Sequence, residues 1–323
     1  MSATTDSTEA TKRSGDVEER FRKNRKRRAL KENLTGYAVI SPWLIGFFGL
    51  TIGPVLMSFY FSFTEYNIIT PPAWIGIENY VRALTNDPRF WHSVRVTLMF
   101  VFVSVPIRLV VALVLAVIFK KRRPGTAIFT TLYYIPSIIG GSVAIAVVWR
   151  QIFGRTGAFN GLLSILGLPG MFDGTYSWLA SPQTAIWMLI LLSLWQFGSP
   201  MIIFLAGLRQ IPKELYEAAS IDGAGALKQF FKITLPMLSP VIFFNLVMQM
   251  IGGFMVFNSG FLITSGGPIG TTTFYSIYLY EVAFQVFRMG YASALAWILL
   301  VIIGFFTALV FWSQKRWVHY TGE

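Results

Sequence analysis

Six long apolar segments decide what this chain can fold into. They lie near residues 37–63, 94–119, 127–150, 184–208, 238–263 and 291–313 of the 323-residue sequence. Each segment reaches the roughly 20 apolar residues that a helix needs to cross the hydrocarbon core of a bilayer. Inside lipid the backbone amides have no water to bond with, so each segment must satisfy them internally as a helix. The sequence therefore predicts an all-α integral membrane protein with six transmembrane helices.

The composition agrees with this class of protein. Hydrophobic residues make up 54% of the chain and charged residues only 13%, whereas a soluble domain carries about 25% charged residues. The absence of cysteine excludes a disulfide framework and thiolate metal sites. The net charge of +12 comes mostly from basic residues outside the apolar segments, so we expect no nucleic-acid partner.

The distribution of Lys and Arg predicts the orientation. One side of the membrane would receive 20 of these residues, in the N-terminal tail, the turn near 120–123, the loop 209–237 and the C-terminal tail, and the other side 6. Because basic residues collect in cytoplasmic loops, both termini and loop 209–237 are expected in the cytoplasm. Residues 1–35 would form a disordered basic tail attracted by anionic lipid or, less simply, a regulatory docking segment. Residues 36–315 would form the membrane domain and residues 316–323 a C-terminal cytoplasmic tail.

Loop 209–237 is longer and more polar than a simple connection requires. Pro212 favours a helix start, Glu214 lies near the positive helix N-terminus, and the pair Asp222-Gly223 predicts a turn after that helix. A second short amphipathic helix is predicted over 226–233. The hairpin could lie on lipid headgroups, but its glutamates would be repelled by anionic lipid, so we favour insertion into a cleft of a soluble protein.

Polar residues inside the spans are costly in lipid and therefore informative. Arg108 must face protein or water, and we expect it to contact a carbonyl or an acid on a neighbouring helix more than a substrate. The fourth and fifth spans carry further polar groups, which could bind the hydroxyl groups and the ring of a sugar, or could simply form interhelical hydrogen bonds. These candidate residues are Ser193, Trp195, Gln196, Ser199, Asn245, Gln249 and Asn258.

Catalytic and metal-binding motifs are absent from the sequence. It has no HExxH motif, no CxxC motif and no paired carboxylates. The glycine-rich run 266–272 lacks the lysine and the strand–helix setting of a phosphate loop and is expected to be a surface turn. The chain has no visible means of hydrolysing ATP, so we expect it to have no catalytic residues, metal or cofactor of its own.

The loop also carries a family motif. Glu217-Ala218-Ala219, Gly223 and the run Ile233-Thr-Leu-Pro resemble the EAA motif of ABC-importer permeases. The resemblance extends over most of the chain to the carbohydrate-uptake subfamily, through the runs 41–46, 76–80, 205–212, 266–268 and 289–294. The ending 316–320 is similar to that of the maltose F-type and glycerol-3-phosphate A-type permeases.

The resemblance implies the type I ABC-importer permease fold in a bacterial or archaeal cell (inner) membrane. The chain would pair with a second permease, while a dimer of cytoplasmic ATPase subunits, which hold ATP and Mg²⁺, would grip the EAA loops. A binding protein outside the cell would deliver a sugar. The coupling residues would be Glu214, Glu217, Ala218, Ala219, Asp222 and Gly223.

Other functions remain open at this level. The imported solute could be a polyol or glycerol-3-phosphate rather than a sugar. A membrane-bound glycosyltransferase-like enzyme would need surface acids beside a cavity, and Asp173 and Glu281 are too isolated to support it. A membrane-embedded assembly or sensor protein is the third class.

Overall fold

The structure is a computed structural model that describes residues 31, 33–121, 124–167 and 176–319. Most of the basic tail 1–35, the acid Asp173 and the last four residues of the C-terminal tail lie outside these described residues. The chain divides into two compact units, residues 1–60 and 61–323. Five helices are long and apolar enough to cross a membrane, and the number is six when one sharply bent helix pair counts as a single span. The predicted all-α membrane fold is confirmed.

The first unit contains one long apolar helix. It runs from Asn33 to Phe61, so only its last residue falls in the second unit, and it includes the π-helical turn η1 (Phe47–Ile52) and the helix α2 (Gly53–Phe61). With 29 residues it is long enough to span a bilayer. This helix corresponds to the predicted first span.

The second unit begins with a short cap of mixed structure. The strands β1 (Thr64–Glu65) and β2 (Ala73–Trp74) pair antiparallel, and they are followed by α3 (Glu78–Val81) and η2 (Arg82–Asn86). The side chain of Asn79 donates hydrogen bonds to the carbonyls of Ser62 (3.0 Å) and Thr64 (2.9 Å), which holds α3 against the hairpin.

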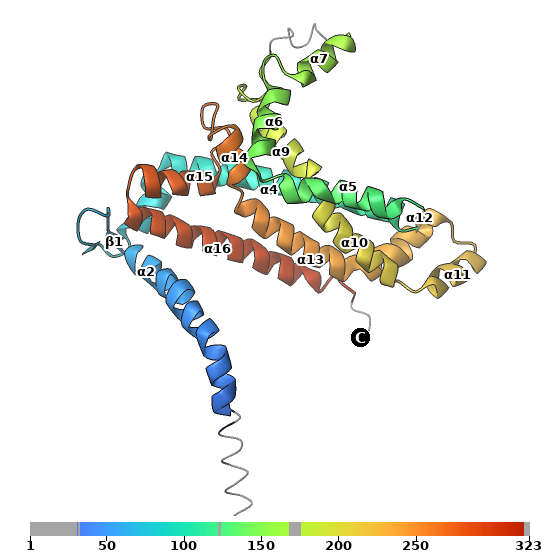
Figure 1. Cartoon of the computed structure of the whole chain (residues 1–323), viewed down its shortest axis with the longest axis horizontal. Coiled ribbons are helices and arrows are strands. Elements are labelled where there is room, and N and C mark those ends of the chain that lie inside the picture. The colour runs from blue at the N-terminus through green and yellow to red at the C-terminus, as the bar shows by residue number, and fades with distance from the viewer. Residues whose placement is uncertain (1–30, 32, 122–123, 168–175, 320–323) are drawn as a thin grey trace, which may run out of the picture. The chain divides into compact units, whose positions relative to one another are not determined.

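Helix α4 (Pro88–Phe119) is the central element of this unit. It begins at a proline, and the Asp87 side chain caps it by accepting a hydrogen bond of 3.1 Å from the Phe90 amide. It packs against α9 (Ala185–Trp195), α10 (Gly198–Gln210), α13 (Leu235–Phe254) and α15 (Tyr275–Tyr280) (Figure 1).

The third apolar segment, predicted as one helix over 127–150, is divided by a sharp bend into two helices. Helix α5 (Thr126–Ile139) ends at Gly140, and a new helix, α6 (Val143–Phe153) followed by α7 (Ala158–Ile165), continues at 97° to it. Ser142 caps the new helix through its hydroxyl. A side chain at Gly140 would collide with Gln196, because an added Cβ would lie 2.4 Å from it. Glycine at the bend thus leaves room for the Gln196 side chain, which would have to move if residue 140 were larger.

The fourth segment is interrupted between α9 and α10. Gln196 and Phe197 separate the two helices. Ser137 of α5 bridges the interruption, since its hydroxyl donates to the Gln196 carbonyl and accepts from the Ser199 amide, both at 2.9 Å. Gly198 lets α10 approach α5, because a Cβ there would lie 2.4 Å from the Tyr133 carbonyl oxygen.

The predicted loop 209–237 contains the helix α11 (Lys213–Ile221) and a second helix that does not end within the loop. α12 (Ala226–Gln229) and the π-helical turn η3 (Phe230–Thr234) run directly into α13, so residues 226–254 form one helix of 29 residues. The predicted fifth span therefore extends into the loop at one end and stops at Phe254 at the other.

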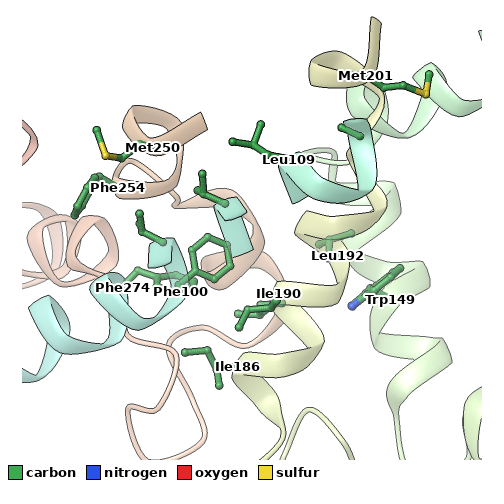
Figure 2. Close-up of a cluster of buried hydrophobic side chains, with 14 of the residues drawn as sticks. Phe100, Leu109, Trp149, Ile186, Ile190, Leu192, Met201, Met250, Phe254 and Phe274 are labelled. Atoms are coloured by element: carbon green, nitrogen blue, oxygen red, sulfur yellow. The ribbon is translucent and has the colours of Figure 1, made fainter. Parts of the chain in front are cut away.

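Residues 255–288 form irregular structure with three short elements, and a last long helix follows. The short elements are α14 (Asn258–Ile263), α15 and η4 (Glu281–Gln285), and the long helix is α16 (Met289–Gln314). The main hydrophobic core lies where α4, α9, α10 and α13 meet, and includes Phe100, Leu192, Met201 and Phe254 (Figure 2). A smaller core with Phe90, Tyr275 and Leu295 joins the start of α4 to α15 and α16.

Candidate functional site

A cavity with a mixed polar and apolar lining lies within the membrane-spanning part of the second unit. Its volume is about 200 Å³, and it is bordered by α4, by the end of α9, and by α13 with the residues that follow it. Hydroxyl and amide side chains from separate helices meet there. The polar residues that line it are Ser104, Arg108, Ser193, Gln196, Gln249 and Ser259.

Arg108 organises this cavity. Its Nε donates a hydrogen bond of 2.7 Å to the carbonyl oxygen of Ser193, and its Nη1 donates to the side-chain oxygen of Gln249. The expected carbonyl contact with a neighbouring helix is present. The same side chain also lines the cavity. Arg108 can therefore bond to neighbouring helices and contact a ligand at the same time.

Three of the predicted pathway residues come together here. Ser193 and Gln196 reach the cavity because α9 ends beside it, and Gln249 reaches it from α13. Discontinuous helices near the middle of the membrane are a common way for transporters to build a substrate site. The break in the fourth segment thus lies where the sequence placed its polar cluster.

The other four predicted residues do not line this cavity. The Trp195 ring packs near Trp149 at a centroid distance of 6.1 Å. The Ser199 main-chain amide donates to the Ser137 hydroxyl at the break between α9 and α10. Asn258 begins α14 and is exposed. Asn245 is fully buried in α13, and its amide nitrogen and oxygen have no hydrogen-bond partner among the described residues. A role for these four in the pathway stays a prediction.

Sequence reasoning missed three serines at the site. Ser104 lies one helical turn before Arg108 and therefore on the same face of α4, a signal that was available in the sequence. Ser259 lies beyond the end of α13, and Ser137 supports the site from α5 without lining it. No local pattern distinguishes these two from other span serines.

The six predicted coupling residues lie on α11 and in the turn that ends it. None of the α11 side chains is buried, and Glu214, Glu217 and Ala218 are exposed. Ala219 is half-buried, and Asp222 and Gly223 form an exposed turn. Gly223 adopts a φ of +73°, which explains why glycine follows this helix. Large apolar side chains are also exposed on the loop, including Ile221 (87%) and Leu227 (76%).

Tyr216 fastens α11 to two other helices. Its hydroxyl lies 2.9 Å from the hydroxyl of Thr234, in the helix that continues as α13. The Lys120 ammonium, directly after α4, lies 3.8 Å from the centre of the Tyr216 ring. Gln229 adds a hydrogen bond of 2.9 Å to the Ser220 hydroxyl. The exposed helix is therefore attached to both helices that carry the Arg108 cavity.

The opposite end of α4 carries a partly buried hydrogen-bonded cluster. The hydroxyls of Tyr278 and Tyr291 donate to the Asp87 carboxylate. Burial would raise the pKa of Asp87, but these hydrogen bonds and those from the Phe90 and Arg89 amides outweigh it, so its pKa lies below the usual value. The cluster therefore holds a charged carboxylate where α4, α15 and α16 meet.

A larger hollow of about 640 Å³ lies at this same end, between the start of α4 and the glycine-rich turn 265–273. It is open, and His92 closes one side of it by a contact of 2.9 Å with the Gly270 carbonyl. Glu281 is ion-paired with Arg89 nearby. The turn connects α14 to α15, not a strand to a helix, and no group of three or more potential metal ligands occurs in the part of the chain that the structure describes.

Comparison with known proteins identifies the family. Residues 80–319 match the family described as "Binding-protein-dependent transport system inner membrane component". The chain belongs to this family of permeases. The permease is 51% identical to YesP of Bacillus subtilis (strain 168), named a probable ABC transporter permease protein, over 91% of this chain and 94% of that one. It is 34% identical to the trehalose/maltose transport system permease protein MalF of Thermococcus litoralis, over 80% and 85% of the two chains.

The solved structures agree on the fold. A chain of a bacterial alginate ABC transporter, crystallised with an alginate pentasaccharide-bound periplasmic protein, has a TM-score of 0.75 at 23% identity, covering 90% of this permease and 96% of that chain. The permease is thus a multi-pass membrane transport subunit and not an enzyme, which leaves the glycosyltransferase-like interpretation without support. The family implies a second permease, an ATPase and a substrate-binding protein as partners.

Proposed function

We propose that this permease forms half of the translocation pathway of an ATP-driven importer for a sugar or oligosaccharide. Relatives at 33–34% identity are named for trehalose/maltose and for arabinooligosaccharides. The serine and glutamine side chains in the cavity lining suit the hydroxyl groups of a sugar, and the apolar residues beside them suit the C–H surface of its ring. The second permease, related to this one, supplies the other half of the pathway.

One observation carries the mechanism. The exposed helix α11 is joined to α4 through Lys120 and to the helix of α13 through Thr234, and both of these helices line the Arg108 cavity. A rigid-body movement of α11 therefore displaces the walls of the cavity directly. Alternating access around a site in the middle of the membrane needs this kind of linkage.

The ATPase dimer docks on α11 from the cytoplasm. Glu217 supplies a polar contact, and the small residues Ala218, Ala219 and Gly223 permit a close fit, with Glu214 and Asp222 at the edges of the surface. ATP and Mg²⁺ bind to those ATPase subunits. The sugar arrives on a binding protein that docks on the opposite side, and lipid surrounds the spans.

The test is site-specific crosslinking in the assembled importer. The chain has no cysteine, so Ala218→Cys introduces a unique thiol on α11 and Ile69→Cys, at a side chain 89% exposed, introduces one at the opposite end of the spans. The thiol at 218 should crosslink to the ATPase, and a membrane-impermeant maleimide should label it only after the cells are permeabilised. The thiol at 69 should be labelled in intact cells and should not reach the ATPase.

Transport is tested with the same complex in proteoliposomes. We expect sugar uptake that requires ATP, the ATPase subunits and the binding protein together. Labelling of position 218 from outside intact cells, or uptake that proceeds without ATP, would contradict the proposal.

A further inference from the structure

Among the residues that the structure describes, Arg108 is a positive charge without an acidic partner. Its two hydrogen-bond acceptors, the Ser193 carbonyl and the Gln249 side-chain amide, are both neutral. None of the six apolar spans contains a single Asp or Glu. The cavity lining has no acidic residue either.

This arrangement is energetically expensive. An arginine near the centre of a membrane helix costs about 2.5–3.5 kcal/mol on insertion scales, and guanidinium stays protonated in proteins. Neutral acceptors satisfy donor groups but do not cancel the charge. A simple contact between helices would need no charge at all, since a glutamine can bond the same carbonyl.

The guanidinium also has room to bind a ligand. The two acceptors take Nε and Nη1, and among the described residues Nη2 donates no hydrogen bond. Arg108 borders the cavity beside Ser104, Gln196 and Ser259. A guanidinium next to hydroxyl and amide groups is the pairing that recognises a carboxylate or phosphate attached to a polyhydroxylated ring.

We infer that the permease carries acidic sugars, and that Arg108 is the residue that recognises the acidic group. This rests on the proposed function and specifies its substrate class. The acidic group is the carboxylate of a uronic acid or the phosphate of a sugar phosphate. The negative group would pass Arg108 during translocation and offset its charge, while the neighbouring serines and glutamines bond the ring hydroxyls.

The experiment uses the complete importer, with its binding protein, in proteoliposomes. Four probes are compared: cellobiouronic acid, digalacturonic acid, glucose-1-phosphate and the neutral disaccharide cellobiose. The first two report on a carboxylate and the third on a phosphate. The variants are Arg108→Gln, Arg108→Lys and, as a matched control, Arg150→Gln. Arg150 also donates to a main-chain carbonyl, that of Ile263 at 2.9 Å, but does not line the cavity.

We expect uptake of at least one acidic probe by the wild type. Arg108→Gln should lower that uptake by about ten-fold or more, a change equivalent to losing one charge-assisted hydrogen bond. Arg108→Lys keeps the charge and should retain a substantial part of the uptake. Arg150→Gln should stay within about two-fold of the wild type.

Several results would overturn the inference. They are uptake confined to cellobiose, an Arg108→Gln variant that imports acidic probes as the wild type does, and equal losses in the Gln and Lys variants. Loss of the second permease from the purified Arg108→Gln complex would also overturn it, because Arg108 would then be an assembly contact. Import of cellobiose alone leaves the sugar-importer proposal standing, whereas no ATP-driven uptake of any sugar by a complete complex would count against both.

Discussion

The two ends of α4 are held in opposite ways. At the Asp87 end, a partly buried cluster of one carboxylate and two tyrosine hydroxyls ties three elements together. At the Lys120 end, one cation–π contact among the described residues joins the residue after α4 to an exposed helix with no buried side chain. Arg108 and its cavity lie between the two ends. The difference suggests a fixed end and a driven end, with movement entering at Lys120 and the Asp87 cluster acting as the anchor.

The largest expected effect comes from the driven end. Glu217→Lys reverses the charge of an exposed residue on α11 without disturbing any internal contact. Uptake should fall by about 100-fold, because a charge left without a matching partner at a docking interface costs several kcal/mol, while the thermal stability of the purified permease stays unchanged. Uptake and ATP hydrolysis in proteoliposomes measure the effect. Glu78→Lys, an exposed carboxylate at the start of α3, is the matched control. Normal uptake by Glu217→Lys would remove α11 from the coupling mechanism.

Much of the driven end could be predicted from the sequence, because its signals are local. The Pro212 start, the turn at Gly223 and the small residues between them lie within one short segment. The cavity could be predicted only in part. Arg108 finds its acceptors 85 and 141 residues away, and the hydropathy of the fourth segment does not reveal its break at Gln196. The bend at Gly140 had a visible Gly-Gly-Ser signal, but the apolar length of the segment outweighed it.

A smaller effect is expected from the contact that links α11 to α4. Tyr216→Leu removes both the ring beneath Lys120 and the hydroxyl near Thr234. A cation–π contact at a partly exposed site is worth about 1 kcal/mol, so the sugar transported per ATP hydrolysed should fall about five-fold. Lys120→Gln should cause a similar loss.

The double variant tests whether the two residues act together. If the contact itself transmits the movement, Tyr216→Leu combined with Lys120→Gln should be no worse than either single change, which a double-mutant cycle measures. Tyr216→Phe keeps the ring and serves as the control for the hydroxyl. Strictly additive losses would mean that the driven end does not act through this contact.

The smallest effect on uptake, and the largest on stability, is expected at the anchored end. Asp87→Asn removes the charge that accepts hydrogen bonds from Tyr278 and Tyr291. Charge-assisted hydrogen bonds contribute about 2 kcal/mol, so the melting temperature of the purified permease should fall by a few degrees. Glu281→Gln is the control, because its ion pair with the exposed Arg89 side chain should contribute less than about 1 kcal/mol. Uptake at moderate temperature should stay within about two-fold of the wild type, since only the driven end has to move.

The pH dependence of this stability gives an independent check. The hydrogen bonds hold the pKa of Asp87 below its ordinary value of 3.8, so the folded state favours the charged carboxylate. Their contribution is complete above the unfolded pKa of about 4 and is lost as the pH falls through the lower folded pKa. The difference in melting temperature between wild type and Asp87→Asn should therefore be constant from neutral pH to about pH 5 and shrink below about pH 4. If Asp87→Asn instead abolished uptake at neutral pH without lowering the melting temperature, the cluster would be part of the moving machinery, and the contrast between the two ends of α4 would fail.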